Sequence, residues 1–326
     1  MTLLTACRGL CPLTPDEPFG SCGPSRLKMS HPTGGNPCSL RSPKARRLFL
    51  KTTMKGTMAM LFYISDIHIE HKIRFEELPE VMPEEEFGKI VAAIVDEVFA
   101  STMPHNEEDY LFIMGDTCES THIGKLLYGR LTQLWKPDHI IVTLGNHELW
   151  TADQQWTDED EKIKPNLKAI IVAWRKVFEE YGVVFLQNDT YEFPGKNTLI
   201  LGGLGFSGRN DYFNACNGMY LRVLTTRRQD QIQSNIFDKL YKETVKKCER
   251  EGKSLIVLTH NPWRDWHNGD IEKEPVSVPV IYFSGHTHKN TCSRIDGVNG
   301  QKWFYADSQV GYPQRQIYYV KVVPEL

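Results

Sequence analysis

No stretch of this 326-residue sequence holds the roughly 18 consecutive apolar residues that a helix needs to cross a bilayer, so we expect no integral membrane protein and no membrane partner. The N-terminus lacks the apolar core of a secretory signal peptide. The eight cysteines show no CxxC spacing, and four of them fall within the first 38 residues, so the rest of the chain predicts neither a zinc ribbon nor a disulfide framework. This cysteine usage favours a reducing compartment, and we expect a cytoplasmic protein.

Positive charge is scarce after the first 55 residues. Residues 1–55 hold nine Lys or Arg and two Asp or Glu, a net charge of +7, which leaves −10 for the remainder of a chain whose total is −3. Surfaces that bind nucleic acid usually carry a basic stripe, and the remainder offers only local patches such as the one with Arg222, Arg227 and Arg228. We therefore do not expect a nucleic-acid partner.

The first 55 residues also differ from the remainder in composition. They are rich in Pro, Gly, Ser and Cys, and their apolar residues follow neither the helical nor the strand period. Such a segment cannot bury enough apolar surface to fold, so we predict a disordered basic leader over 1–55 and one folded domain over 56–326. The Arg content and the few acids leave an organelle transit peptide as an alternative.

Short apolar runs alternate with long amphipathic segments through the folded part. Several runs are apolar throughout, as expected for strands that are covered on both faces. The predicted strands are residues 60–65, 109–115, 139–145, 198–205, 254–260, 280–286, 302–307 and 317–323. The predicted helices are 87–98, 167–181 and 232–248, and the apolar stripe of the third, which begins at Ile232 and Ile236, should face the core. This alternation predicts an α/β layered fold.

Five predicted strands end in polar residues of the same kind. The strand ends read SDIH (65–68), GDTCE (115–119), GNHE (145–148), THNP (259–262) and GHTH (285–288). Because ligands of α/β sheets bind beyond the carboxyl ends of the strands, where loops converge, these side chains should meet at one point. A lone DxH is a weak signal for metal ligands and a lone GD is weaker still, but a coincidence of core histidines does not explain five such strand ends in one chain.

The converging side chains have the chemistry of metal ligands. Imidazole, carboxylate and amide oxygen without thiolate suit Mn, Fe or Zn, and burying such charges without a cation would be costly. Gly115, Gly145 and Gly285 each precede a candidate, where the backbone must turn sharply off a strand. Eight candidates are too many for one ion and suit two ions plus a catalytic side chain: Asp66, His68, Asp116, Asn146, His147, His260, His286 and His288.

In their order, DIH, GD, GNHE, His260 and GHTH resemble the motifs of the calcineurin-like metallophosphoesterases, from about residue 60 to the C-terminus. The resemblance implies a four-layer α/β/β/α sandwich of two mixed β-sheets flanked by helices. It also implies a phosphoric ester hydrolase with two divalent metal ions, for which we expect manganese first, with iron or zinc as alternatives. One ion would be held by Asp66, His68, Asp116 and His288, and the other by Asp116, Asn146, His260 and His286.

The charge of a phosphate ester suggests a mechanism. The ester is anionic and repels nucleophiles, so two cations would neutralise it and supply hydroxide for in-line attack on phosphorus. The leaving oxygen needs a proton, and His147, directly after Asn146, is our candidate general acid, with a purely structural imidazole as the alternative. Glu148 either orients this turn or lies exposed. Arg209 either binds phosphate or is a surface side chain.

We expect the substrate to be a small or medium phosphate mono- or diester. The serine/threonine protein phosphatases of the same superfamily carry Arg directly before GNHE, where this sequence has Leu144, so we do not expect protein phosphatase activity. A nuclease of the same superfamily is the first alternative, and a non-catalytic scaffold with this fold, which the complete donor set disfavours, is the second. An acidic loop at 150–162 is either a lid or a surface excursion.

Overall fold

The computed structural model describes residues 60–149, 167–216, 226–271, 273–274, 276–288, 294–296 and 302–304. The predicted leader, the acidic loop at 150–162 and the predicted strand at 317–323 lie outside these residues, so these predictions are not tested. Among the helices of the described ranges, none is long and apolar enough to cross a membrane.

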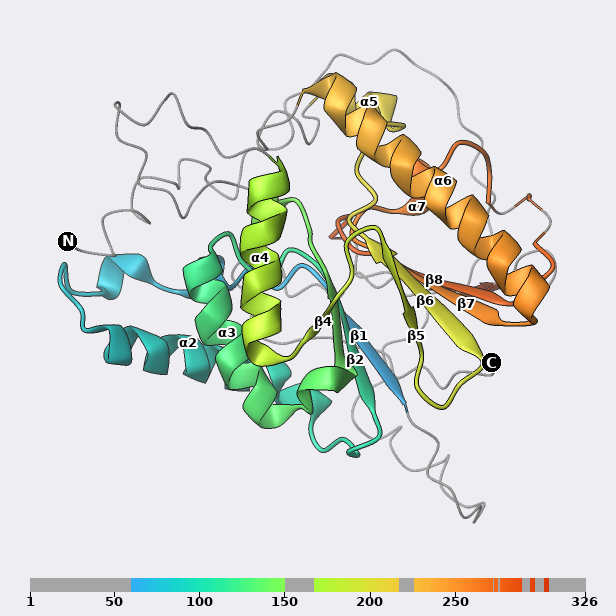
Figure 1. Ribbon diagram of the computed structural model, residues 1–326. Coiled ribbons are helices and arrows are strands. Elements are labelled where there is room, and N and C mark those ends of the chain that lie inside the picture. Colours follow the sequence, from blue (N-terminus) through green and yellow to red (C-terminus); the bar gives the residue numbers. More distant parts are fainter. Residues whose placement is uncertain are drawn as a thin grey trace, which may run out of the picture.

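Two β-sheets lie at the centre of the molecule (Figure 1). The first contains, in spatial order, β1 (Leu61–Ile64), β2 (Tyr110–Met114), β3 (Ile140–Thr143) and β4 (Val184–Phe185). The second contains β5 (Asp189–Glu192), β6 (Thr198–Gly203), β7 (Ser254–Thr259), β8 (Val280–Phe283), β10 (Lys302–Phe304) and β9 (Arg294–Asp296). The described pairings of the first sheet are parallel, whereas the second is mixed because β5 and β9 run antiparallel to their neighbours.

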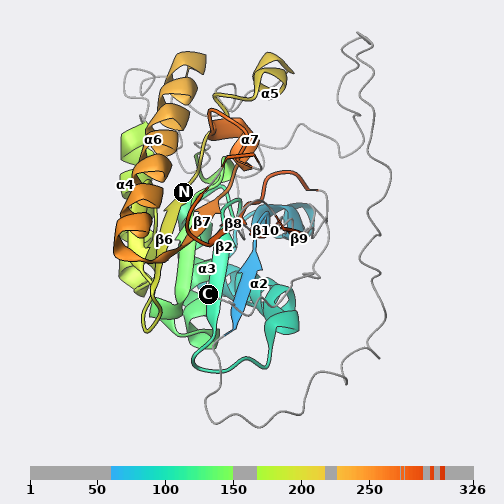
Figure 2. The ribbon, with the colours of Figure 1, turned by 90° about the vertical axis from the view of Figure 1, so that its right-hand side faces the viewer.

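Helices cover the outer face of each sheet, as Figures 1 and 2 show from two directions. The first sheet packs against α2 (Glu84–Phe99), α3 (Thr121–Leu134) and α4 (Leu167–Tyr181). The second packs against α6 (Arg227–Glu251) and α7 (Trp263–Trp266). A third apolar cluster, with Tyr63, Phe112 and Phe283 among its members, fills the space between the sheets. The order helix, sheet, sheet, helix confirms the predicted fold class.

Short helical segments fill the connections. They are η2 (Ile69–Lys72), η3 (Phe75–Glu77), η4 (Ala100–Thr102), η5 (Pro137–His139), η6 (His147–Leu149) and α5 (Asp211–Cys216). Two of them, η2 and η6, follow strand ends that carry candidate metal ligands, so the chain turns into a helical segment directly beyond each of those ligands.

The prediction for the apolar stripe of α6 is partly wrong. Tyr241, Val245 and Cys248 are buried as expected, but Ile232 and Ile236 are 45% and 46% exposed. The first half of the helix buries a polar stripe instead, which consists of Asp230, Ser234 and Asp238. These side chains bind neighbouring loops: Asp230 accepts from Ser207, Ser234 accepts from the Gly208 N–H, and Asp238 contacts His267.

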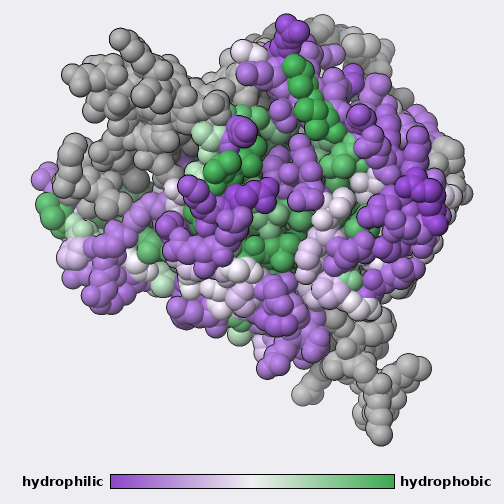
Figure 3. All heavy atoms as spheres, in the orientation of Figure 1, coloured by the Kyte–Doolittle hydropathy of each residue, from purple (hydrophilic) through white to green (hydrophobic). Residues whose placement is uncertain are grey.

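Figure 3 shows apolar side chains at the surface near the N-terminal end of α6, within an otherwise mostly hydrophilic face.

The two ends of α6 are well defined because both are capped. Thr226 and Gln229 form a capping box at its start, and Gly252, with φ of 65°, ends it. The loop contacts of its polar stripe, rather than its apolar period, therefore fix how its first half faces the molecule.

Candidate metal centre

The five polar strand ends converge at the carboxyl edge of the two sheets. The segment after β1 supplies Asp66 and His68, and the segment after β2 supplies Asp116. The segment after β3 supplies Asn146 and His147. From the second sheet, β7 leads to His260, and β8 leads to His286 and His288. All eight side chains therefore reach one region from five strands.

The backbone at these strand ends is strained. Seven non-glycine residues in the described ranges have positive φ, and five of them are candidate ligands: Asp66 at 54°, His68 at 48°, Asp116 at 52°, His286 at 74° and His288 at 49°. Such conformations cost about 1–3 kcal/mol each and persist only where the surroundings fix them. The turn after β1 is fixed by backbone hydrogen bonds, from Asp66 N to Gly115 O at 3.0 Å and from His68 N to Asp116 O at 2.9 Å.

Two glycines permit the close approach of neighbouring strand ends. A Cβ atom at Gly145 would overlap the Asp116 carboxylate, and one at Gly285 would overlap Ser65 and Asp66. Neither overlap could be relieved by moving the end of a flexible side chain, because both involve atoms next to the backbone. The predicted need for glycine before the ligands thus has a steric reason in the structure.

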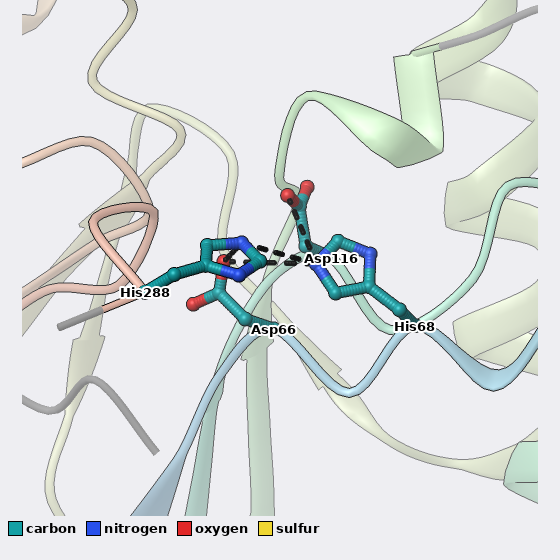
Figure 4. A group of neighbouring side chains, drawn as sticks. All are labelled: Asp66, His68, Asp116 and His288. Atoms are coloured by element: carbon teal, nitrogen blue, oxygen red, sulfur yellow. Dashed lines mark hydrogen bonds and ion pairs between the residues drawn. The ribbon is translucent and has the colours of Figure 1, made fainter. Parts of the chain in front are cut away.

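The first group of donors consists of Asp66, His68, Asp116 and His288, whose polar ends point toward one another (Figure 4). Nε2 of His288 lies 3.1 Å from Oδ1 of Asp66 and 3.3 Å from Nε2 of His68. Nε2 of His68 lies 3.9 Å from Oδ2 of Asp116. Asp66, His68 and Asp116 are buried, and only His288 has appreciable exposure.

The second group consists of Asp116, Asn146, His260 and His286. Nε2 of His260 lies 3.3 Å from Oδ2 of Asp116, 3.0 Å from Oδ1 of Asn146 and 3.1 Å from Nδ1 of His286. Nδ1 of His286 lies 3.0 Å from the same Asn146 oxygen. Asp116 belongs to both groups, so a single carboxylate stands between them.

These separations fit donors arranged around cations. Ligands that each lie about 2.0–2.2 Å from a divalent ion are roughly 3.0–3.5 Å from one another. The contacts within each group fall largely in that range. The nitrogen and oxygen atoms that make these contacts would share a cation as ligands, and the donor set of imidazole, carboxylate and amide suits Mn, Fe or Zn.

Electrostatics place most of the donors in the protonation state that metal binding requires. Burial would raise the pKa of Asp116, but the imidazoles of His260 and His147 outweigh it and hold that pKa well below its usual value. Burial lowers the pKa of His68 well below its usual value and that of His286 to about 4. Burial opposes a charge on His260 too, yet the Asp116 carboxylate raises its pKa to about 10. Asp116 is therefore ionised while His68 and His286 are neutral.

Glu148 orients the turn, which was one of its two predicted roles, and it is only 2% exposed. Its carboxylate accepts hydrogen bonds from the backbone N–H groups of Asp116 at 2.9 Å, Thr117 at 2.6 Å and Gly145 at 2.7 Å. One side chain thereby ties the end of β2 to the end of β3. This arrangement supports the position of Asp116 between the two donor groups.

His147 lies at the edge of the first donor group. Its backbone N–H donates to Oδ1 of Asp116 at 2.9 Å, and its ring centroid is 4.3 Å from that of His68. Nδ1 of its ring lies 3.1 Å from Oε1 of Glu119. From the sequence alone, neither Glu119 nor the nearby His71 was expected to belong to the site. Glu119 ends the GDTCE motif, so its place three residues after Asp116 was an available signal.

Arg209 and two aromatic side chains near His260 lie away from the donors or inside the core. The guanidinium of Arg209 is exposed and donates to Asn235 on α6, so the structure does not bring it into either donor group. Trp263 packs in the core beneath α6. His267 lies between Asp238 and Glu274, at 2.6 and 3.1 Å.

A family model for calcineurin-like phosphoesterases matches residues 61–290 of this chain. The match covers all eight candidate side chains and both sheets up to β8. Together with the fold and the paired donor groups, it defines the class of protein as a metal-dependent phosphoesterase. The chain belongs to the calcineurin-like phosphoesterase family.

Solved structures include relatives in fold. The phosphopantetheinyl hydrolase PptH from Mycobacterium tuberculosis is similar with a TM-score of 0.53 and 17% sequence identity, over 83% of this chain and 98% of that one. A protein of unknown function from Aquifex aeolicus, AQ665, has a TM-score of 0.31 and 14% identity, over 80% of this chain and 95% of that one. PptH supports the fold alone, and AQ665 adds no argument. The comparison with curated proteins gives no match.

Proposed function

We propose that this phosphoesterase is dinuclear and hydrolyses a small phosphate mono- or diester. One divalent ion would be held by Asp66, His68, Asp116 and His288, and the other by Asp116, Asn146, His260 and His286. The observation that carries the proposal is the position of Asp116. Its carboxylate belongs to both donor groups, with Oδ2 at 3.9 Å from His68 Nε2 and at 3.3 Å from His260 Nε2.

When bound, two divalent ions neutralise a phosphoryl group and supply hydroxide at neutral pH for attack on phosphorus. The protein's own contribution is to fix the donors before substrate arrives. The Glu148 carboxylate holds the backbone of Asp116, and the Met114 carbonyl lies 2.8 Å from Nδ1 of His260. Because the carbonyl accepts from the Nδ1–H group, His260 would offer Nε2 to a metal ion once that nitrogen has lost its proton, as in many metal sites.

We assign His147 the role of general acid for the leaving oxygen. Its Nε2 lies 3.8 Å from Oδ2 of Asp116, close to the donors, and it is not needed to complete either group. Glu119 accepts from Nδ1 of the ring, so this contact leaves Nε2 as the atom that would donate a proton to the leaving oxygen. The donated proton would let the ester oxygen leave as a neutral hydroxyl. Help of this kind is typically worth about 10²–10⁴-fold in rate.

Manganese is the first metal we propose, with iron or zinc as alternatives, because nitrogen and oxygen donors without thiolate accept all three. A nuclease of the same family is the runner-up function. The net charge of −10 after residue 55 argues against it, since a polyanion would be repelled over most of that surface.

The proposal can be tested with metal-free protein that is reloaded with Mn²⁺, Zn²⁺ or Mg²⁺. Bound metal per chain is measured beside turnover of p-nitrophenyl phosphate, a monoester, and bis-p-nitrophenyl phosphate, a diester. We expect two ions per chain and metal-dependent hydrolysis of at least one ester. Asp116→Asn should lose both ions and turnover together, whereas the control Asp211→Asn, at a side chain 87% exposed, should keep both.

One ion per chain at full activity would contradict the dinuclear assignment. Loss of only one ion from Asp116→Asn would contradict the shared position of that carboxylate. A fully loaded protein that hydrolyses neither ester but cleaves single- or double-stranded DNA or RNA, with strong salt dependence, would favour the nuclease.

A further inference from the structure

A second set of donors lies on the other side of the His147 ring. Nε2 of His147 is directed toward Asp116, while Nδ1 lies 3.1 Å from Oε1 of Glu119. The same Glu119 oxygen lies 3.8 Å from Nε2 of His71. One donor atom from each of His71, Glu119 and His147 lies within 4.8 Å of the others. These three side chains come from η2, the segment after β2, and η6.

The surroundings of this set are acidic. The backbone N–H of Glu119 donates to Oε1 of Glu70. Oε2 of Glu70 is buried and has no hydrogen-bond partner among the residues that the structure describes. A buried carboxylate oxygen without a partner costs free energy, and a nearby cation would lower that cost.

The set is also open to solvent on one side. The His71 side chain is 29% exposed, against 13% for Glu119 and 5% for His147. A cation from solution can therefore reach the set at His71. Access at this point does not require passage past the buried carboxylates of Asp66 and Asp116.

We propose that His71, Glu119 and Nδ1 of His147 form a third cation site, which takes Zn²⁺ when zinc is in excess and then slows turnover. Two imidazoles and a carboxylate are a common ligand set for zinc. The site should be weaker than the two donor groups, because it has three side chains rather than four and one of them is partly exposed. Only the inhibition rests on the proposed function of His147; the binding of the third ion does not.

Inhibition follows from proton chemistry at the ring. With protons on both nitrogens, His147 can give up the Nε2 proton and become a neutral imidazole. With Zn²⁺ at Nδ1, the ring keeps a single proton, on Nε2, and giving it to the leaving oxygen would leave an imidazolate anion. That transfer is less favourable, so the zinc-loaded ring is a poorer acid.

The test uses the full chain reconstituted with Zn²⁺ and dialysed against rising concentrations of free Zn²⁺. Bound zinc is measured by elemental analysis, and turnover of the better ester is measured in the same samples relative to each variant's own maximum. The wild type should bind two ions tightly and then a third, with turnover falling as the third binds. His71→Ala should bind two ions over that range, and its half-inhibiting zinc concentration should rise by about 10–100-fold.

His122→Ala is the matched control, because His122 is 33% exposed, pairs with Glu84 and does not belong to this set of donors. It should bind and respond to zinc as the wild type does. Equal zinc content in the wild type and His71→Ala throughout the titration would overturn the third site. A third ion that binds at His71 without slowing turnover would overturn the inhibition. If no variant hydrolyses any ester, the proposed function has failed, and the zinc contents still decide whether the third site exists.

Discussion

Within β1 and β2 every residue is buried and the backbone is extended, but beyond the strand ends the chain turns to positive φ, at Asp66 after β1 and at Gly115 and Asp116 after β2. The strand interiors consist of side chains such as Phe62, Leu111 and Phe112, which are buried in the apolar clusters on the two faces of the first sheet. The strand ends instead collect carboxylates and imidazoles in conformations that few residues adopt. Two regions of the same strands therefore differ in what stabilises them.

The difference shows how stability and function are divided in this molecule. The interiors are stabilised by burial of apolar surface, about 25 cal/mol for each Å² removed from water. The ends are destabilised by backbone strain and by crowded charges, and they persist because the sheets and the Glu148 carboxylate hold them. Changes at the ends should therefore affect activity first, whereas changes in the interiors should affect the free energy of unfolding first.

Among substitutions that leave both ions bound, the largest effect on turnover is expected at His147, a strand-end residue. His147→Ala should lower turnover by about 10²–10⁴-fold, because the leaving oxygen loses its proton donor. The metal content should stay at two ions per chain, because the imidazole belongs to neither donor group. Turnover equal to that of the wild type would remove His147 from its assigned role, and loss of an ion would make it a ligand instead.

A strand-interior change should have the opposite profile. Phe112→Ala should lower the free energy of unfolding by about 3–5 kcal/mol, because Phe112 is fully buried between the sheets, 5.6 Å from the Phe283 ring. Chemical denaturation measures the loss, and Tyr212→Ala, at a side chain 77% exposed, is the control. The surviving folded fraction should bind metal as the wild type does. Loss of metal from folded Phe112→Ala would contradict the claim that the strand interiors stabilise the fold without affecting metal binding.

Glu148→Gln tests the Glu148 clamp, by which we mean the hydrogen bonds from the backbone N–H groups of Asp116, Thr117 and Gly145 to this carboxylate. Glutamine keeps the shape of the side chain but directs an amide N–H group at backbone donors that the carboxylate now satisfies. We expect a loss of about 1–3 kcal/mol in the free energy of unfolding together with weaker metal binding. Glu179→Gln, on the exposed face of α4, should change neither quantity. An effect on stability without an effect on metal affinity would mean that the clamp serves the fold alone.

The smallest effect is expected on α6. Ile236→Ser should change the free energy of unfolding by no more than about 0.5 kcal/mol, because the side chain is 46% exposed. Phe237→Ser, one residue further at a fully buried position, should cost several times more. If denaturation shows that Ile236→Ser lowers the free energy of unfolding by several kcal/mol, Ile236 is buried and the predicted apolar stripe is correct.

The strand interiors and the donor residues could be predicted because each has a local signal. Uninterrupted apolar runs marked β1, β2, β3, β6, β7 and β8, and the polar residues that follow them marked the strand ends. Whether those ends meet depends on how the strands are ordered in the sheets, which the local pattern does not contain. The resemblance to a family implied the layered fold and the division of the side chains into two ligand sets, but it gave no strand order.

The elements that were missed depend on tertiary contacts. α3 was missed because it carries two glycines, which weaken the helical pattern of its sequence. One of them, Gly124, is needed because it lies against the Trp174 ring, where a larger residue would clash. The strands β4, β5 and β9 have two to four residues each, too few for a period. The exposed Ile232 and Ile236 were misplaced because the polar side chains of α6 bind loops that are distant in the sequence.

Asp116 should lie between two cations, and anomalous diffraction from a crystal of the Mn²⁺-loaded protein tests this position directly. We predict two anomalous peaks roughly 3.5–4 Å apart, each within bonding distance of the Asp116 carboxylate, one beside His288 and the other beside His286. A single peak, or two peaks of which only one contacts Asp116, would contradict it.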